Sequence, residues 1–284
     1  MSLVPYKGVE IFNEDGTFKK EDDKVQGRSY SSNLTKLLKQ LPKLQNLQEG
    51  KKASPVMAHI SLTNSCNLTC SFCCFANRDI SEKMPTEKVF QALESFKAIG
   101  VTGVEFTGGG EPSIHPDFKA IVNYAKDLGF SLGICTNAAR FGKDRQIKKD
   151  IVELFDWVRM GMYGFYEGYD YDLSVFEGTN CKPSAAYVWD ENLETSENPN
   201  ITGEWSDVKN KRVLSKKFQT TESFIRMLDR VEENKIPCRI AFNAIKDVKE
   251  TAKDSETIRE IIAEYENDRG RKLKSAFLSD FNFK

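Results

Sequence analysis

Histidine is scarce in this chain of 284 residues, which contains only two, His59 and His115. Long apolar runs are missing too: no stretch is long enough to cross a bilayer, and residues 1–20 carry charges where a signal peptide would be apolar. The formal net charge is −1, so no bulk field draws the protein to nucleic acid or to a membrane surface. These absences predict a cytoplasmic protein with no membrane partner and no clear nucleic-acid partner.

The sequence also lacks the two cysteine pairs of a typical zinc site. Zinc sites usually repeat the spacing C-x2-C, and no second half of such a site follows the first cysteines of this chain. Disulfides are rare in the cytoplasm, so the seven cysteines are better explained as free thiols, metal ligands or core residues. Cys74, Cys135, Cys181 and Cys238 are scattered, and we expect Cys135 and Cys238, which fall in predicted strands, to lie in the core. Their spacing does not support a second iron–sulfur cluster, which is called an auxiliary cluster.

The other three cysteines, Cys66, Cys70 and Cys73, stand close together with the spacing C-x3-C-x2-C. Thiolates are soft ligands, and a short loop can direct three of them at one inorganic centre. Three is one fewer than the four that close a [4Fe–4S] cluster, so one iron would stay open to bind something else. Two alternatives remain: a zinc site with Cys74 or His59 as its fourth ligand, and ordinary buried thiols.

Strand and helix patterns alternate through most of the chain, which predicts an α/β fold. The expected strands cover residues 56–63, 101–107, 130–136, 157–162, 237–244 and 273–278, and the expected helices cover 86–99, 117–128, 147–155, 221–234 and 256–265. Right-handed crossovers between six strands allow a doubly wound sheet or a barrel with fewer strands than the eight of a full TIM barrel.

Two segments fall outside this alternation. Residues 1–55 have leucines at helical spacing from 33 to 47, interrupted by Pro42, and predict an N-terminal helical extension before a main domain at 56–284. Residues 165–217 form a long insertion between the fourth strand and the fourth helix, and their first half is acidic and rich in tyrosine. We expect this insertion to cover an active site and its acidity to suit a polar or cationic substrate; a disordered acidic loop is the alternative.

A glycine run ends the second predicted strand, where Gly108, Gly109 and Gly110 precede Glu111 and Pro112. Glycines let a backbone approach a ligand closely, and a glutamate adds an acceptor for an ammonium group. A tight turn would use the same residues, so the run alone is weak evidence. Next to the cysteine loop, it predicts a place where an amino-acid moiety binds.

The cysteine triplet after the first strand and Gly-Gly-Glu-Pro after the second together resemble the radical S-adenosylmethionine (radical SAM) superfamily, in its molybdenum-cofactor-type and peptide-maturing members. The resemblance covers roughly residues 56–280 and implies a partial (β/α)6 TIM-like barrel. It also implies that Cys66, Cys70 and Cys73 hold a [4Fe–4S] cluster whose open iron chelates S-adenosylmethionine (SAM).

The same resemblance assigns cofactor-binding roles to residues that follow several strands: Phe72, Gly109, Gly110, Glu111, Thr136, Asn137 and Asn243. Phe72 resembles the aromatic residue near the adenine, and the glycines with Glu111 resemble the stretch that meets the methionine amino group. Thr136 and Asn137 resemble a Thr-Asn-Gly motif, although Ala138 replaces its glycine. Asn243 resembles a polar SAM contact, or else it bonds to backbone at a strand end.

Strand four departs from the family. Gly161 falls where many relatives have a serine that contacts the ribose or the methionine carboxylate. The resemblance therefore leaves this contact open, with Arg159 and Tyr163 as candidates to replace it.

The activity implied is that of a radical SAM enzyme, an oxidoreductase or a transferase. The cluster takes an electron from an external flavodoxin- or ferredoxin-like donor, and SAM is cleaved to methionine and a 5′-deoxyadenosyl radical that abstracts hydrogen from an unidentified polar substrate, a small molecule or a peptide. One alternative is an activase that acts on a glycyl-radical enzyme. An alternative of another class is a non-catalytic iron–sulfur or zinc protein.

Overall fold

The computed structural model describes residues 40–70, 72–75, 77–189, 220–242 and 248–278. Two compact units divide the chain, residues 1–53 and residues 54–284. In the described part of the first unit there is one helix, α2 (Leu41–Gln48), and Pro42 stands in its first turn. Pro42 therefore marks the start of this helix, because an N–H at that position would have no partner within the helix anyway. Residues 33–39 of the expected helix lie outside the described residues.

The second unit is built on a sheet of seven parallel strands that are hydrogen-bonded to one another in chain order. The strands are β1 (Met57–Ser61), β2 (Gly103–Thr107), β3 (Ser131–Thr136), β4 (Trp157–Gly161), β5 (Lys182–Trp189), β6 (Cys238–Phe242) and β7 (Ala276–Leu278). In the described residues β1 and β7 do not pair with each other, so the sheet stays open. Strands in chain order exclude a doubly wound sheet, in which the order reverses part-way, and confirm the partial TIM-like barrel.

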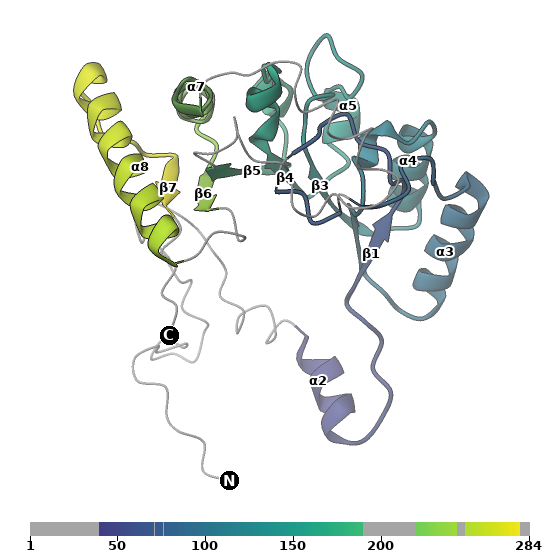
Figure 1. The fold of residues 1–284 in the computed structure, drawn as a ribbon. Coiled ribbons are helices and arrows are strands. Elements are labelled where there is room, and N and C mark those ends of the chain that lie inside the picture. Colours follow the sequence, from purple (N-terminus) through teal and green to yellow (C-terminus); the bar gives the residue numbers. More distant parts are fainter. Residues whose placement is uncertain (1–39, 71, 76, 190–219, 243–247, 279–284) are drawn as a thin grey trace, which may run out of the picture. The chain divides into compact units, whose positions relative to one another are not determined.

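In the described part of the second unit, five helices form an arc around the outside of the strands (Figure 1). They are α3 (Thr86–Ala98), α4 (Phe118–Asp127), α5 (Lys149–Val152), α7 (Thr220–Glu233) and α8 (Val248–Arg269). Their apolar faces meet the outer side of the sheet; Leu93 of α3 and Phe224 of α7, for example, are fully buried. Helix α8 is longer than the helix expected at 256–265, and α5 is shorter than the one expected at 147–155.

Alternation along the strands separates a buried face from a face that lines a cavity. Val104 and Phe106 of β2 and Ile134 of β3 are fully buried in the core. Thr107 and Cys135, which are next to them in sequence, line the cavity inside the partial barrel. Because side chains alternate in a strand, polar residues reach the interior of the barrel while apolar ones hold the helices.

The sheet has one strand more than expected, because residues 182–189 of the predicted insertion form β5. Ala185, Tyr187 and Trp189 alternate as its buried residues. We missed this strand because Lys182 and Pro183 begin it with poor strand formers. Proline is tolerated there because pairing with β6 begins only at Ala185, so one edge of β5 is still open at Pro183.

The residues between β4 and β5 are packed rather than loose. They form two 3₁₀ helices, η2 (Met162–Glu167) and η3 (Leu173–Phe176), and the Tyr171 hydroxyl accepts a hydrogen bond from Gly164 N at 2.8 Å. The alternative of a disordered loop is wrong for these residues. Residues 190–217 of the predicted insertion lie outside the described residues, so a cover over the active site stays a prediction.

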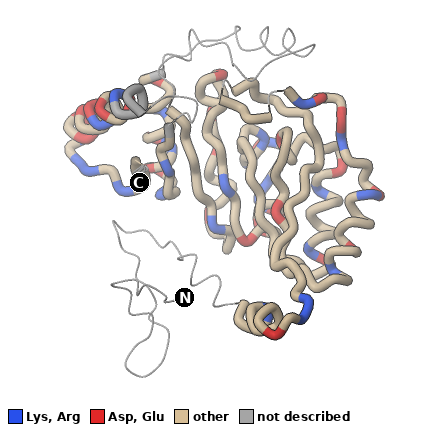
Figure 2. The backbone as a smooth tube through the Cα atoms, turned by 60° about the horizontal axis from the view of Figure 1, so that its bottom comes forward, with Lys and Arg blue, Asp and Glu red and all other residues tan. Residues whose placement is uncertain are grey.

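Charges of both signs are interspersed over the described chain (Figure 2). None of the helices in that part of the chain has the length and apolar character that a membrane span requires. A cytoplasmic location stays a prediction.

Candidate active site

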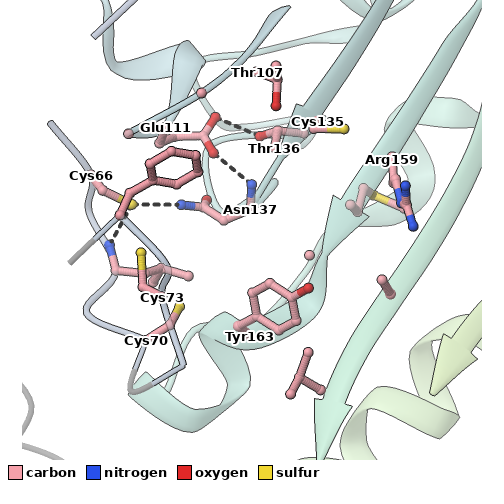
Figure 3. Close-up of a pocket in the computed structure, with 18 of the residues that line it drawn as sticks. Cys66, Cys70, Cys73, Thr107, Glu111, Cys135, Thr136, Asn137, Arg159 and Tyr163 are labelled. Atoms are coloured by element: carbon pink, nitrogen blue, oxygen red, sulfur yellow. Dashed lines mark hydrogen bonds between the residues drawn. The ribbon is translucent and has the colours of Figure 1, made fainter. Parts of the chain in front are cut away.

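A cavity of about 350 Å³ lies at the carboxyl ends of the strands, inside the partial barrel (Figure 3). All three predicted cluster ligands line it: Cys66, Cys70 and Cys73. Five predicted SAM-binding residues line it too: Gly109, Gly110, Glu111, Thr136 and Asn137. Phe72 packs edge-on against Tyr163, a residue of the cavity wall, with 4.9 Å between ring centroids. Asn243 lies outside the described residues.

The loop that carries the three cysteines is held in place by groups from other strands. The hydrogen bonds are Glu111 N to Ser65 O (2.8 Å), Asn137 Nδ2 to Asn67 Oδ1 (2.7 Å) and Thr69 N to Glu167 Oε1 (2.5 Å). The partners outside the loop are Glu111 after β2, Asn137 after β3 and Glu167 after β4. The loop is therefore fixed on either side of Cys66 and just before Cys70, so the directions of these two thiols depend on the assembled sheet.

Arg78 closes the same loop from its far end. Its guanidinium donates to Asn64 O at 2.5 Å, contacts Phe75 O, and lies 3.5 Å from the Cys73 sulfur. One side chain thus joins the residues just before and just after the triplet. Neither Arg78 nor Glu167 could be found from the sequence, because nothing in the order of residues shows which distant side chain meets a loop.

The thiols themselves are only partly exposed. Burial raises the pKa of the Cys66 thiol and, more strongly, that of Cys70, and the neighbouring cysteines add to both effects. The Leu68 N–H and the Arg78 guanidinium oppose this at Cys66. Three soft donors in one half-buried loop suit a positively charged inorganic group, which would take up the charge of the thiolates when their protons leave.

The geometry does not suit a single zinc ion. Among the described residues, no three His, Cys, Asp or Glu side chains are close enough together to hold one metal ion. Zinc–thiolate bonds of about 2.3 Å would bring the sulfurs within about 4 Å of one another. Neither proposed fourth ligand joins the triplet, because Cys74 is exposed and His59 Nδ1 pairs with Glu105 Oε2 at 3.3 Å. In a [4Fe–4S] cluster each thiolate would bind a different iron, so the three sulfurs do not have to lie as close together as around one zinc ion.

The glycine run packs against the cysteine loop. A Cβ atom at Gly110 would lie 2.0 Å from Ser65 O, and one at Gly109 would lie 2.5 Å from Asn64 Oδ1. We expected these glycines to give space to a ligand; the structure shows that they first give space to the loop that carries the cysteines. Gly110 N also donates to Thr63 O at 2.9 Å, so the two loops are joined by backbone hydrogen bonds.

Glu111 is the buried centre of the site, with 2% of its surface exposed. Its Oε1 accepts from Ser113 N (3.1 Å), Ser113 Oγ (2.6 Å) and Thr136 Oγ1 (2.6 Å), and its Oε2 accepts from Asn137 N (2.6 Å). The carboxylate thus ties the glycine loop to the end of β3 and orients Asn137, whose amide reaches the cysteine loop. It has an organising role in addition to the predicted one in ligand binding.

Replacing Glu111 with glutamine should destabilise the fold. A glutamine amide places N–H groups where Oε2 accepts the Asn137 N–H, so at least one buried donor loses its partner. We expect Glu111→Gln to lower the free energy of unfolding by about 3 kcal/mol, measured by urea denaturation. The control is Glu87→Gln, at an exposed position of α3, which should change it by less than about 0.5 kcal/mol. Equal denaturation midpoints for the two variants would show that the Glu111 network does not hold the site together.

The family comparison agrees with this geometry. Residues 60–169, which include the cysteine triplet, the glycine run, Glu111, Thr136 and Asn137, match the family described as the Radical SAM superfamily. The chain contains a radical SAM domain. The family implies a [4Fe–4S] cluster and SAM as cofactors, and the side chains that line the cavity fit that pair.

Relatives of the radical SAM domain differ widely in their names. Over 98 residues, the chain is 33% identical to the S-adenosylmethionine-dependent nucleotide dehydratase of Selenomonas ruminantium, a match that covers 34% of this chain and 35% of the relative. Over 95 residues, it is 28% identical to the sporulation killing factor maturation protein SkfB of Bacillus subtilis, covering 33% of this chain and 23% of the relative. The chain therefore spans about a third or less of these curated relatives. Their names indicate an enzyme and leave the reaction open.

One solved structure with a similar fold is that of Streptococcus suis SuiB bound to S-adenosylmethionine. The match has a TM-score of 0.46 and 18% sequence identity, and it covers 90% of this chain and 55% of that chain. Such a similarity is too weak for a residue-by-residue comparison.

The presence of glycine rather than serine at position 161, at the end of β4, has a steric reason. A Cβ atom at Gly161 would lie 2.5 Å from the ring of Tyr163, so the serine expected from the resemblance would not fit here without moving that ring. Tyr163 and Arg159 both line the cavity, as does Gly161. Both candidates for replacing the serine contact therefore face the site.

Two other sequence predictions, for Cys238 and Cys135, can be compared with the structure. Cys238 is buried, as expected, but Cys135 is only half-buried and lines the cavity, where its thiol donates to Glu105 Oε1 at 3.2 Å. The prediction of a core role for Cys135 is therefore wrong, because its position in β3 faces the barrel interior. His115 is buried and bonds through Nε2 to Met84 O at 2.9 Å, which indicates a structural role.

Proposed function

We propose that the chain is a radical SAM enzyme in which Cys66, Cys70 and Cys73 hold a [4Fe–4S] cluster and SAM binds in the adjoining cavity. When bound, the two cofactors would supply the 5′-deoxyadenosyl radical that abstracts hydrogen from the substrate. One observation carries the proposal: three thiols, the glycine loop and the ends of β2 and β3 line a single cavity. A mere electron carrier needs no such space beside its cluster.

The residues around the cavity have distinct proposed roles. The backbone of Gly109 and Gly110, with Glu111 below it, receives the amino-acid end of SAM. Thr136 and Asn137 end the neighbouring strand, and both are bonded to Glu111, so they present a rigid wall to the ligand. Phe72 and Tyr163 contact each other and contribute an aromatic surface suited to a base such as adenine.

The cluster would need an electron from outside, and we propose a flavodoxin- or ferredoxin-like donor. Cys74, directly after the triplet, is exposed and does not line the cavity in the described structure. This exposed part of the cysteine loop gives such a donor a contact close to the cluster. The substrate remains polar and unidentified; two curated relatives are named for a nucleotide and for maturation of a killing factor.

The test is anaerobic reconstitution with iron and sulfide, followed by incubation with dithionite and SAM. The proposed enzyme should bind about four irons per chain, be brown, and release 5′-deoxyadenosine. Addition of SAM should change the electron paramagnetic resonance spectrum of the reduced cluster, because SAM binds the open iron. A cluster whose spectrum ignores SAM would indicate an electron carrier, and colourless protein with stoichiometric zinc would indicate a zinc module. Either result would overturn the proposal.

A further inference from the structure

Two arginines face the cavity without a partner among the residues that the structure describes. Arg159 on β4 and Arg239 on β6 both line it, and among the described residues neither guanidinium forms a hydrogen bond or an ion pair. A third arginine of the lining, Arg78, is bonded to the cysteine loop. Figure 3 shows Arg159 on the side of the cavity opposite the three cysteines.

The sheet register brings the two arginines toward one another. Arg159 pairs with Ser184 of β5, and Arg239 pairs with Ala186, two residues farther along the same strand. With about 4.8 Å between strands and about 3.3 Å per residue, the two Cα atoms lie about 12 Å apart, within the combined reach of two arginine side chains. Ala186 between them is small, so the space above it is open.

Tyr163 lines the same cavity as the two arginines. Burial raises the pKa of its hydroxyl, while Arg159 and Arg239 both act to lower it. The hydroxyl is a further hydrogen-bond donor. Two guanidiniums and one phenol thus line one cavity.

The acidic groups of this region do not neutralise the pair. Among the described residues, Glu111 is the one acidic residue that lines the cavity, and its oxygens already accept four hydrogen bonds. Glu105 accepts from the Cys135 thiol at 3.2 Å and pairs with His59 Nδ1 at 3.3 Å. Three acidic residues of the predicted insertion that the structure describes have partners: Asp170 pairs with Arg230 at 2.7 Å, Asp172 accepts from Lys143 N at 2.6 Å, and Glu167 accepts from Thr69 N at 2.5 Å.

SAM does not neutralise the pair either. It carries one carboxylate against an ammonium and a sulfonium, so it adds one net positive charge to the cavity. If Arg159 binds that carboxylate in place of the missing serine, Arg239 is still without a counter-charge. A bound cluster with its three thiolates would carry a charge of about −1, or about −2 when reduced. Added to SAM, Glu111, Arg78 and the two arginines, this leaves a net charge of about +1 to +2 in the cavity. An excess of positive charge favours an anionic ligand in addition to SAM.

We propose that Arg159 and Arg239 bind a phosphate group of the substrate. A phosphate monoester carries a charge of about −1.5 to −2 at neutral pH and has three acceptor oxygens, which match two guanidiniums and a hydroxyl group. A carboxylate has one charge and two oxygens and would leave one guanidinium unmatched. The inference rests on the proposed function, because it places the substrate next to SAM in the same cavity.

Calorimetric titration of the full chain with inorganic phosphate tests this site. The titration is run on the reconstituted protein with saturating SAM and on the cluster-free protein, at constant ionic strength, with acetate as the carboxylate probe. Phosphate should bind more tightly than acetate, and Arg239→Gln and Arg159→Gln should each weaken phosphate binding by about tenfold or more. Arg239→Gln should leave the affinity for SAM within about twofold of the wild type, because in this proposal Arg239 contacts the phosphate and does not contact SAM.

Two variants control this test. Arg271→Gln removes an exposed arginine outside the cavity and should leave phosphate binding unchanged. Arg239→Lys keeps the charge but loses the planar fork, so its affinity should lie between those of the wild type and Arg239→Gln. Unchanged phosphate binding in both glutamine variants, or equal affinity for acetate, would overturn the inference, and so would an equal loss of SAM binding in Arg239→Gln. If the chain instead assembles no cluster or ignores SAM, the proposed function fails, while phosphate binding to the cluster-free protein still tests the arginine pair.

Discussion

After anaerobic reconstitution, the Cys70→Ala protein should contain almost no iron. With dithionite and SAM it should release no measurable 5′-deoxyadenosine. Cys70 lies in the middle of the triplet, and the bond between Thr69 N and Glu167 fixes the loop directly before it. Loss of this thiolate leaves two protein ligands for a cluster that already lacks a fourth. Because changing a residue that merely orients a ligand costs about 10–100-fold in metal affinity, losing a ligand should cost at least about 100-fold.

Cys74→Ala is the matched control for this prediction. Cys74 is adjacent to Cys73 in sequence, yet it is exposed and does not line the cavity in the described structure. The Cys74→Ala protein should keep about four irons and the wild-type rate of SAM cleavage. Iron analysis and chromatography of the nucleoside products measure both quantities. Full activity in Cys70→Ala, or loss of iron in Cys74→Ala alone, would mean that the ligand set is wrong.

Gly110→Ala should damage both the fold and cluster binding. A Cβ atom at this position would lie 2.0 Å from Ser65 O and 2.6 Å from the Asn64 carbonyl carbon, and neither backbone atom can move without shifting the cysteine loop. The backbone of Gly110 does not have a positive φ, so the effect is one of space rather than of backbone strain. We expect a loss of about 2–3 kcal/mol in the free energy of unfolding, with a melting temperature lower by about 4–12 °C.

Gly103→Ala makes the same chemical change in β2. Its nearest neighbours would lie 3.5 Å or more from the new methyl group, at ordinary contact distance. This variant should unfold within about 0.5 kcal/mol of the wild type and should bind iron normally. Thermal melting followed by circular dichroism, and iron content after reconstitution, separate the two variants. Similar behaviour of both would show that the glycine run and the cysteine loop are not packed as the structure shows.

Much of the fold follows from local patterns in the sequence. Helix α3 was predicted nearly to its ends because Val89 and Leu93 repeat at helical spacing and Gly100 follows them. Strand β2 was predicted because a short apolar run lies between that helix and the glycine run. The chain-order arrangement of the strands came from the resemblance to a family and could not have come from periodicity, because barrels and doubly wound sheets have the same local patterns.

The missed strand shows where local patterns fail. β5 begins Lys-Pro-Ser-Ala, which has low strand propensity, and its place in the sheet depends on pairing with β4 and β6. The alternation of Ala185, Tyr187 and Trp189 was the available signal, although it is short. Residues 182–189 were therefore assigned to an insertion when they complete the wall of the cavity.

The sequence predicted the three cysteine ligands, but it did not predict the side chains that hold their loop in place. The spacing of Cys66, Cys70 and Cys73 shows the ligands directly, since they are neighbours in sequence. Arg78 and Glu167 support the loop through contacts that depend on the tertiary fold. The outward or inward direction of Cys135 was equally beyond local reasoning, since a residue of a predicted strand can face either side.

The hydrogen bonds that hold the cysteine loop predict when, during synthesis of the chain, a cluster can be inserted. Asn137 and Glu167 are separated in sequence from their partners in the loop by 70 and 98 residues. During synthesis the three thiols thus emerge from the ribosome long before the groups that orient them. A nascent chain that ends at residue 136 would present the thiols on an unsupported loop, and cluster delivery should succeed only once β4 and the turn after it have docked. Insertion of the proposed cluster would therefore follow the completion of the first half of the barrel.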